Sequence, residues 1–162
     1  GKDMRCDAHI FAQLYETVYI DLYRFALCMM KNKHDAEDAV SESVLKAYEN
    51  IRKLKNEDAF KSWIFTITAN TCRQKLRDAA KKKSEPMEEA KLHTLSKEED
   101  YGVSIDIRRA LTVLNEEEQA VIGLSVFGGY SSKEIGKILG LNDATVRSKK
   151  ARALEKMECV LK

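Results

Sequence analysis

The sequence predicts an all-α fold in which two small helical domains are joined by a flexible linker, the C-terminal domain being a helix-turn-helix. Three observations lead to this prediction. Apolar residues recur at steps of three and four along most of the chain, which is the spacing of one buried helix face. One proline and seven glycines among 162 residues favour long helices over strands and turns. A charged segment with few apolar residues, 78–104, separates the predicted domains 8–77 and 105–162.

The first domain is expected to contain three helices that bury one core. The apolar stripe of a single long first helix consists of Phe11, Leu14, Tyr15, Val18, Leu22, Phe25 and Met29. Residues 31–34 interrupt the pattern, and Asp35 is a plausible N-cap for the second helix. The buried face of that helix is Ala36, Ala39, Val40, Val44, Ala47, Tyr48 and Ile51. A polar stretch from Arg52 to Asp58 ends it. The third helix then places Phe60, Trp63, Ile64, Ile67 and Thr71 on one side.

The segment 78–104 contains Pro86, the one proline, and its charges are segregated. A basic block beginning in the third helix consists of Arg73, Lys75, Arg77, Lys81, Lys82 and Lys83. The acidic block that follows consists of Glu85, Glu88, Glu89, Glu98, Glu99 and Asp100. This composition is typical of a mobile linker. The basic block fits either a solvated helix C-terminus or a phosphate-contacting surface.

The strongest local signal lies at 132–150, which reads SKEIGKILGLNDATVRSKK. It follows a helix that Asn115 is expected to cap, and Ser131 or Ser132 should cap the next one. Gly136 is expected where the two helices of the motif cross closely, and Gly140 in a turn that needs a positive φ. Asn142 or Asp143 should cap the second helix of the motif, with Val146 packing inward. This is the pattern of a helix-turn-helix.

The outward face of the motif's second helix is polar and basic. Its residues are Ala144, Thr145, Arg147, Ser148, Lys149 and Arg152. A helix fits the major groove, where arginine can bond guanine bidentately while lysine and threonine hold phosphates. The pattern therefore predicts binding to duplex DNA, and protein docking is the alternative use of the same fold.

A second surface signal lies on the predicted second helix, where Asp38, Glu42, Leu45 and Glu49 share a stripe opposite the core. Periodicity alone favours an ordinary solvated face, and the alternative is a docking strip in which carboxylates flank an apolar anchor.

Composition limits the classes of function. Net charge is only +2, and no apolar run reaches the length of a membrane span. The four cysteines are far apart and no secretory signal is recognisable, so we expect a reduced, cytoplasmic protein whose cysteines are mostly core residues. Cys6 and His9 lack further ligands, so neither a metal nor another cofactor is predicted. No set of catalytic side chains is spaced to meet, which argues against an enzyme.

Together these blocks resemble the extracytoplasmic-function group of the sigma-70 family of bacterial transcription initiation factors. The first family block reads roughly D-A-E-D-x-x-Q-E-x-F-L-K-A-Y, and residues 34–51 read HDAEDAVSESVLKAYENI. Residues 60–71, FKSWIFTITANT, are similar to the family's F-x-x-W-L-x-x-I-A-x-N-x. In the second domain, ALTVLNEEEQAV at 110–121 and YSSKEIGKILGLNDATVRS at 130–148 are similar to the two later family blocks.

The resemblance implies a promoter-specificity subunit without catalysis of its own. The strip implied to bind core RNA polymerase is Asp38, Ser41, Glu42 and Leu45. The residues implied to capture the melted −10 element are Asn56, Asp58, Lys61, Asn70, Arg73 and Arg77. The residues implied to read the −35 duplex are Thr145, Arg147, Ser148, Lys149 and Arg152. An anti-sigma factor is the further partner that the resemblance implies, and no membrane contact is expected.

Some positions depart from the family pattern. Ser41 stands where glutamine is usual, Lys150 where an aliphatic residue is usual, and Leu154 where arginine is frequent. Promoter preference therefore does not carry over from relatives. The alternative function is a helix-turn-helix regulator that binds duplex operators without being a polymerase subunit.

Overall fold

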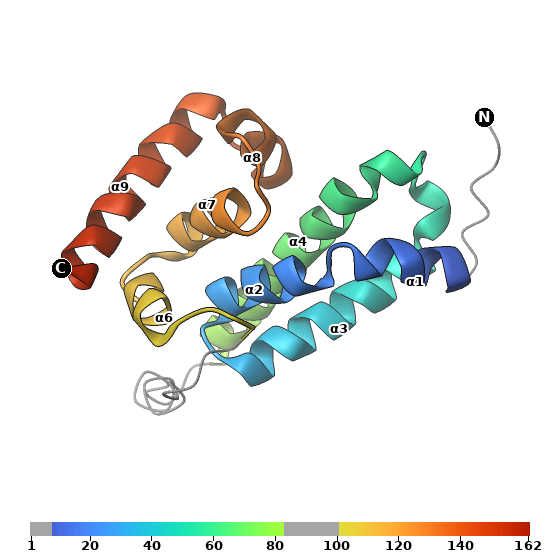
Figure 1. The fold of residues 1–162 in the computed structure, drawn as a ribbon, viewed down its shortest axis with the longest axis horizontal. Coiled ribbons are helices and arrows are strands. Elements are labelled where there is room, and N and C mark those ends of the chain that lie inside the picture. The colour runs from blue at the N-terminus through green and yellow to red at the C-terminus, as the bar shows by residue number, and fades with distance from the viewer. Residues whose placement is uncertain (1–7, 83–100) are drawn as a thin grey trace.

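The computed structural model describes residues 8–82 and 101–162, and the regular elements in these ranges are helices (Figure 1). The N-terminal group consists of α1 (Ala8–Glu16), α2 (Tyr19–Met30), α3 (Lys33–Glu49), the 3₁₀ turns η1 (Ile51–Lys53) and η2 (Glu57–Ala59), and α4 (Phe60–Lys81). The C-terminal group consists of α6 (Ile105–Leu111), α7 (Glu116–Val126), α8 (Ser132–Leu139) and α9 (Asp143–Leu161). The all-α prediction, with a helix-turn-helix in the second group, is confirmed.

The prediction of one long first helix is wrong, because the chain breaks between α1 and α2. The backbone N–H groups of Thr17 and Val18 donate to carbonyls three residues back, at 3.2 and 3.0 Å, and so tighten the turn. The Thr17 hydroxyl also donates to the Leu14 carbonyl at 2.6 Å, competing with the helical pattern. Val18 is buried at the break. No proline or glycine lies at this break, and the apolar spacing continues across it. The sequence pattern therefore did not indicate where α1 ends.

The N-cap of α3 also differs from the prediction. Asn32, not Asp35, caps the helix, and its side-chain oxygen accepts the backbone N–H of Asp35 at 2.8 Å. Lys31 precedes it with a φ of 69°, which turns the chain sharply between α2 and α3. At its far end, α4 continues to Lys81, so the start of the predicted linker is helical. The rest of that segment, from 83 to 100, lies outside the described residues.

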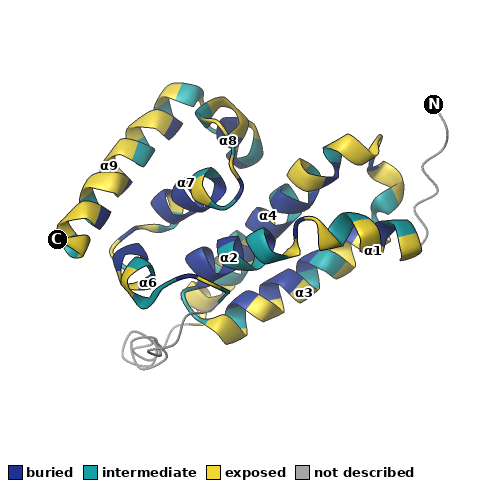
Figure 2. Cartoon of the chain, viewed as in Figure 1, coloured by how far each residue is buried: buried dark blue, intermediate teal, exposed yellow. Residues whose placement is uncertain are grey.

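The first core lies between α2, α3 and α4 (Figure 2). Leu22 and Phe25 of α2, Val40 of α3 and Phe65 of α4 are fully buried there. Trp63, expected on the buried stripe, is only half-buried and packs beside Phe60 with ring centroids 6.3 Å apart. Helices α2, α3 and α4 therefore form a compact bundle around these residues.

This core does not stop at the first helical group. Val121 and Leu124 of α7, Ile135 of α8 and Val146 of α9 belong to the same buried cluster as the first group's core residues. Helix α7 packs on α2, and α8 packs on α4. The sequence predicted two tethered modules and did not place them against each other, whereas the structure joins them through apolar contacts.

The three cysteines among the described residues are either buried in the core or exposed to solvent. Cys28 and Cys72 are buried, as expected of small core residues, whereas Cys159 is exposed on α9. Cys6 lies outside the described residues. Burial raises the pKa of the Cys28 thiol to about 12, so this group is protonated at neutral pH.

Candidate nucleic-acid interface

Helices α8 and α9 form a helix-turn-helix whose turn is built from short-range contacts. Gly140 ends α8 with a φ of 73°, and the Leu141 backbone N–H donates to the Gly136 carbonyl at 2.9 Å. A Cβ added at Gly136 would lie 2.5 Å from the Leu141 carbonyl oxygen, so only glycine fits there. Asn142 then caps α9 by accepting the Thr145 N–H at 2.7 Å. These contacts set the angle between the two helices.

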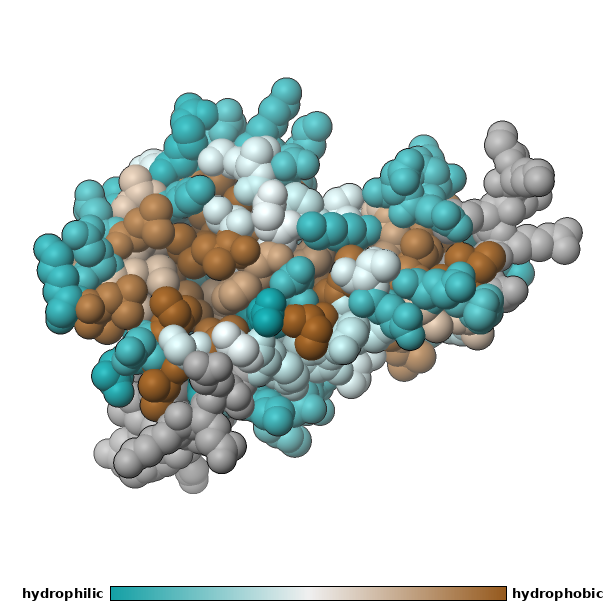
Figure 3. All heavy atoms as spheres, in the orientation of Figure 1, coloured by the Kyte–Doolittle hydropathy of each residue, from teal (hydrophilic) through white to brown (hydrophobic). Residues whose placement is uncertain are grey.

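The outward face of α9 is open to solvent (Figure 2). Hydrophilic side chains line this outer edge of the molecule in the same view (Figure 3). Val146 and Ala153 point inward and are fully buried, while Arg147, Ser148 and Arg152 are exposed. Of the five residues predicted to read duplex DNA, the remaining two, Thr145 and Lys149, are half-buried.

Two of these basic residues have acidic partners within the chain. The Arg147 guanidinium pairs with the Asp143 carboxylate one turn earlier at 2.6 Å. The Lys149 ammonium pairs with the Glu117 carboxylate at the start of α7 at 3.0 Å. Arg147 keeps 61% of its side chain exposed, against 25% for Lys149, so Arg147 is the freer of the two.

An ion pair between Lys156 and the buried carboxylate of Glu118 links α9 to α7. Glu118 is only 2% exposed, and its carboxylate accepts from the Lys156 ammonium at 2.8 Å and from the Asn115 backbone N–H at 2.9 Å. Burial alone raises the pKa of Glu118, but these two donors outweigh it and hold the pKa below its ordinary value. The same carboxylate completes the capping box of α7, as expected from Asn115. One acidic group therefore stabilises a helix start and a helix crossing.

Glu118→Gln should lower stability at neutral pH by about 1–3 kcal/mol, because a charge-assisted bond to Lys156 is lost. Because the pKa of Glu118 is lower in the folded chain than in the unfolded chain, its ionised carboxylate stabilises the fold at a pH above the unfolded-state pKa. This contribution is lost as the pH falls through the folded-state pKa. The stability difference between parent and variant should therefore shrink between roughly pH 5 and pH 3. The free energies of unfolding of parent and variant are measured by urea unfolding at about pH 5 and about pH 3. Glu155→Gln, on the exposed side of α9, is the control. A difference that is the same at both pH values would contradict the role of the charge.

The acidic strip lies on α3, on the side away from the core. Asp38, Ser41 and Leu45 are exposed, and Leu45 exposes 60% of its surface. Glu42 is held differently, because its carboxylate pairs with the ammonium groups of Lys75 on α4 at 2.9 Å and Lys46 at 3.3 Å. The hydrogen bond from Lys75 is the main reason that the pKa of Glu42 is lowered. Burial opposes this shift, and the hydrogen bond from Lys46 adds to the lowering. The strip therefore offers an apolar centre and carboxylates, one of which is already partnered.

Near this strip, oxygen and nitrogen atoms of His34, Asp35 and Asp38 lie within 4.8 Å of one another. Asp35 is hydrogen-bonded to the Asn32 amide at 2.7 Å, and His34 lies 3.7 Å from Asp38. These contacts account for the cluster as the capped first turns of a helix.

The residues predicted for −10 capture are distributed over η2 and the length of α4. Asn56 is occupied as the N-cap of η2, where it accepts the Ala59 N–H at 3.0 Å, and Asp58 is exposed beside it. On α4, Asn70 and Arg77 are exposed. The other two contact the C-terminal group, Lys61 at Tyr130 in the α7–α8 connection and Arg73 at Glu116 of α7. The structure thus spreads these six residues over η2 and α4 and does not gather them in one pocket.

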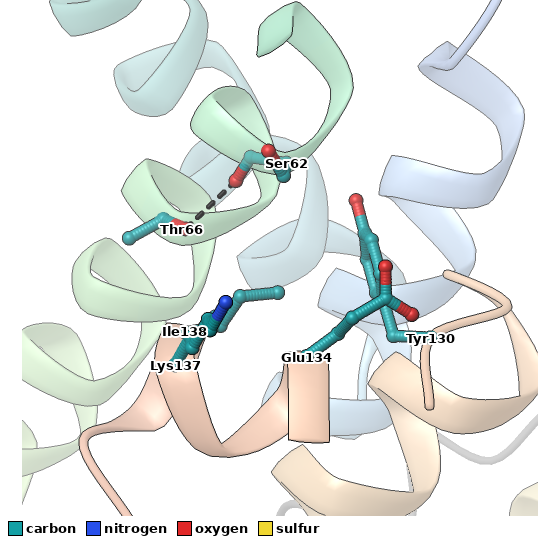
Figure 4. Close-up of a pocket in the computed structure, with 6 residues that line it drawn as sticks. All are labelled: Ser62, Thr66, Tyr130, Glu134, Lys137 and Ile138. Carbon is teal, nitrogen blue, oxygen red and sulfur yellow. Dashed lines mark hydrogen bonds between the residues drawn. The ribbon is translucent and has the colours of Figure 1, made fainter. Parts of the chain in front are cut away.

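A polar cleft separates α4 from α8. It has a volume of about 280 Å³ and is lined by Ser62, Thr66, Tyr130, Glu134, Lys137 and Ile138 (Figure 4). The Thr66 hydroxyl donates to the Ser62 carbonyl at 2.7 Å on the α4 side. Neither this cleft nor the position of Tyr130 in its lining was predicted from the sequence. Neither periodicity nor a motif indicates which residues of the two helical groups contact each other.

A bundle of helices joined to a helix-turn-helix with an exposed basic second helix defines a DNA-binding protein. Comparison with known proteins refines this class. Residues 14–82 match the family model for Sigma-70 region 2, and residues 104–157 match the model for Sigma-70, region 4. The chain is 34% identical to RNA polymerase sigma factor SigV of Bacillus subtilis over 142 residues, covering 87% of this chain and 84% of the relative. It is 28% identical to ECF RNA polymerase sigma factor SigM of Mycobacterium tuberculosis over 155 residues, covering 96% of this chain and 79% of the relative.

The chain therefore belongs to the sigma-70 family of RNA polymerase sigma factors, in its extracytoplasmic-function group, and acts as an alternative sigma factor that directs transcription initiation. Solved structures share the fold. The sigma factor RpoE, in complex with the anti-sigma factor NepR from Bartonella quintana, superposes with a TM-score of 0.78 at 22% identity, covering 93% of this chain and 96% of that one. CnrH, in complex with the cytosolic domain of CnrY, superposes with a TM-score of 0.70 at 22% identity, covering 96% of this chain and 89% of that one.

Proposed function

We propose that this sigma factor binds core RNA polymerase through α3, captures the melted −10 strand along η2 and α4, and reads the −35 duplex with α9. The observation that carries the proposal is the exposed basic face of α9 on the same chain as the exposed Leu45 with its flanking acids. Two such surfaces at opposite ends of a helical chain suit a subunit that links an enzyme to its promoter. Catalysis would reside in the polymerase, and the chain would contribute binding energy alone.

The cytoplasm is the expected location, because the polymerase acts there. Within 8–82 and 101–162, no helix combines the length and apolar character needed to cross a bilayer. We also propose an anti-sigma partner, since the structural neighbour RpoE was solved with the anti-sigma factor NepR. The anti-sigma proposal is tested separately, by co-expressing the chain with a candidate inhibitor and measuring transcription with core polymerase.

Reconstituted transcription tests the main proposal. Core polymerase is assayed on a promoter library with and without this chain, and start sites are read by sequencing the transcripts. Specific initiation that depends on the chain is the expected result. Binding to duplex operators with no effect on initiation would instead support the helix-turn-helix regulator.

Arg147→Ala should weaken −35 duplex binding by about 1–3 kcal/mol and relax the preference at one base pair, because arginine pairs bidentately with a guanine edge. The matched control is Arg109→Ala on α6, since Arg109 also has 61% of its side chain exposed and an acidic neighbour, Asp106. Binding-site selection with the full chain measures both variants. An unchanged base preference for Arg147→Ala would contradict a reading role.

A further inference from the structure

The first turns of α9 carry an exposed ion pair. Asp143 follows the N-cap Asn142, and its Oδ2 atom lies 2.6 Å from Nη1 of Arg147, one turn further along the helix. The side chains of Asp143 and Arg147 keep 46% and 61% of their surface exposed. The pair therefore lies on the solvent side of α9, at the end of the helix that would reach base edges in the major groove.

Stability does not account for this pair. Ion pairs between exposed side chains contribute little to the free energy of unfolding, because solvent screens the charges and two long side chains lose freedom. The dipole of α9 favours an acidic residue in the first turn, which explains a carboxylate at position 143 but not its contact with Arg147. What remains is the effect of the carboxylate on the arginine.

The carboxylate of Asp143 offsets the charge of Arg147 without using all of its donors. A guanidinium has five N–H donors, and the ion pair engages the Nη1 end. Within the described residues, Nε and Nη2 of Arg147 donate to no other group. Guanine O6 and N7 accept from two such donors, whereas backbone phosphates attract net positive charge. The pair therefore favours a guanine edge over the DNA backbone.

The other basic side chains of this face are held differently. Lys149 pairs with Glu117 of α7 and exposes only 25% of its side chain. Arg152 is exposed and forms no ion pair with the described carboxylates, so it keeps its charge for a phosphate. The face thus has a nearly neutral donor pair near the start of α9 and a cation further along the helix.

We propose that Asp143 determines specificity in −35 recognition, by positioning the guanidinium of Arg147 for a guanine edge and keeping it away from phosphates. Asp143 acts through Arg147, and the inference rests on the proposed DNA-reading role of α9. Without the carboxylate, the freed cation would pair with a phosphate. A chain that lacks it should bind DNA in general more tightly and select its site less well, which is the opposite of what a folding defect does.

Two measurements on the full chain separate this role from a structural one. The first is base preference, obtained by binding-site selection with −35 duplexes. The position that matters is the base pair at which Arg147→Ala alters the preference. The second is the affinity for a duplex of unrelated sequence, measured as a function of salt concentration. Thermal unfolding reports whether each variant is folded.

Asp143→Ala should lower the base preference at that position by roughly fivefold or more, the lower end of what a bidentate contact contributes. Its affinity for the unrelated duplex should rise. The plot of log affinity against log salt concentration should steepen by roughly 0.9, the value for one added phosphate contact. Asp143→Glu keeps a carboxylate four residues before Arg147 and should behave like the parent. In a chain that carries Arg147→Ala, adding Asp143→Ala should change neither measurement.

Glu158→Ala is the matched control. Glu158 pairs with Lys162 at the same spacing of four residues, at the other end of α9, with 3.5 Å between the charged atoms. This variant removes one negative charge from the same helix without touching Arg147. It should leave the base preference and the salt dependence unchanged. Asp143→Asn, which keeps the shape of the side chain, replaces Asp143→Ala if the latter does not fold.

A parent-like base preference in the folded Asp143 variants would overturn the proposal, and so would an equal loss of affinity for every duplex. A further change of preference when Asp143→Ala is added to Arg147→Ala would show that Asp143 acts by a contact of its own, which also contradicts the positioning role. Failure of the proposed function looks different. In that case Arg147→Ala itself leaves the base preference unchanged, or the parent does not support initiation with core polymerase.

Discussion

Leu45→Arg should weaken the binding of core RNA polymerase by roughly 30-fold or more, a loss of about 2 kcal/mol or more, while the unfolding temperature of the free chain stays unchanged. Leu45 is 60% exposed on α3. A large apolar side chain surrounded by polar residues gains free energy when a partner covers it, whereas an arginine in its place must lose its hydration when the partner covers it.

Polymerase affinity is measured by displacement of a fluorescent sigma factor, and stability by thermal unfolding. Glu37→Arg is the control, because Glu37 is exposed on the flank of α3, off the strip. Equal affinities of Leu45→Arg and the parent would remove Leu45 from the interface. Glu42→Lys is a less direct probe, since it would bring a third ammonium group beside Lys75 and Lys46 and disturb the α3–α4 contact itself.

Gly136→Ala should destabilise the helix-turn-helix by about 2–3 kcal/mol and reduce −35 duplex binding in proportion to the unfolded fraction. Alanine favours a helix over glycine by about 1 kcal/mol, so propensity alone would stabilise α8. The added Cβ, however, would lie 2.5 Å from the Leu141 carbonyl oxygen, in the turn that the Leu141 N–H closes onto Gly136. Backbone on both sides cannot move without losing that turn, so the steric cost exceeds the gain in propensity.

Urea unfolding followed by circular dichroism measures the effect, and a −35 duplex titration follows function. Lys137→Ala is the control, because Lys137 is exposed on the same helix and its shortening creates no such contact. A variant as stable as the parent would show that the turn adjusts to a methyl group, and the close approach would then not explain this glycine.

The sequence predicted best where a few neighbouring residues decide the structure. The capping role of Asn115 and the left-handed turn at Gly140 are confirmed, since a cap or a glycine turn depends on side chains within about four residues. The open alternatives resolve to Ser131 as the N-cap of α8 and Asn142 as that of α9. Asp35 failed as an N-cap because the helix begins earlier, at Asn32, whose side chain accepts the backbone N–H of Asp35 and so places Asp35 in the first turn.

Periodicity was a poorer guide to boundaries. The stripe from Phe11 to Met29 runs through the break at Thr17 without a change of spacing, because α1 and α2 both bury the same side against α3 and α4. The site residues stand similarly. Arg147, Ser148 and Arg152 are exposed on α9, while Thr145 and Lys149 are half-buried. The pairing of Lys149 with Glu117 links positions on different helices that no local pattern relates.

By itself, the sequence determined the helical class, the helix-turn-helix and the family, because these depend on local spacing and on motifs contiguous along the chain. Only the tertiary structure decided how the two helical groups meet. Phe25 of α2 and Gly123 of α7 meet at this contact although they are nearly a hundred positions apart, and Phe25 would look like an ordinary core residue whether or not α7 covered it. Apolar burial is non-directional, so the pattern states that a face is buried but not against which partner.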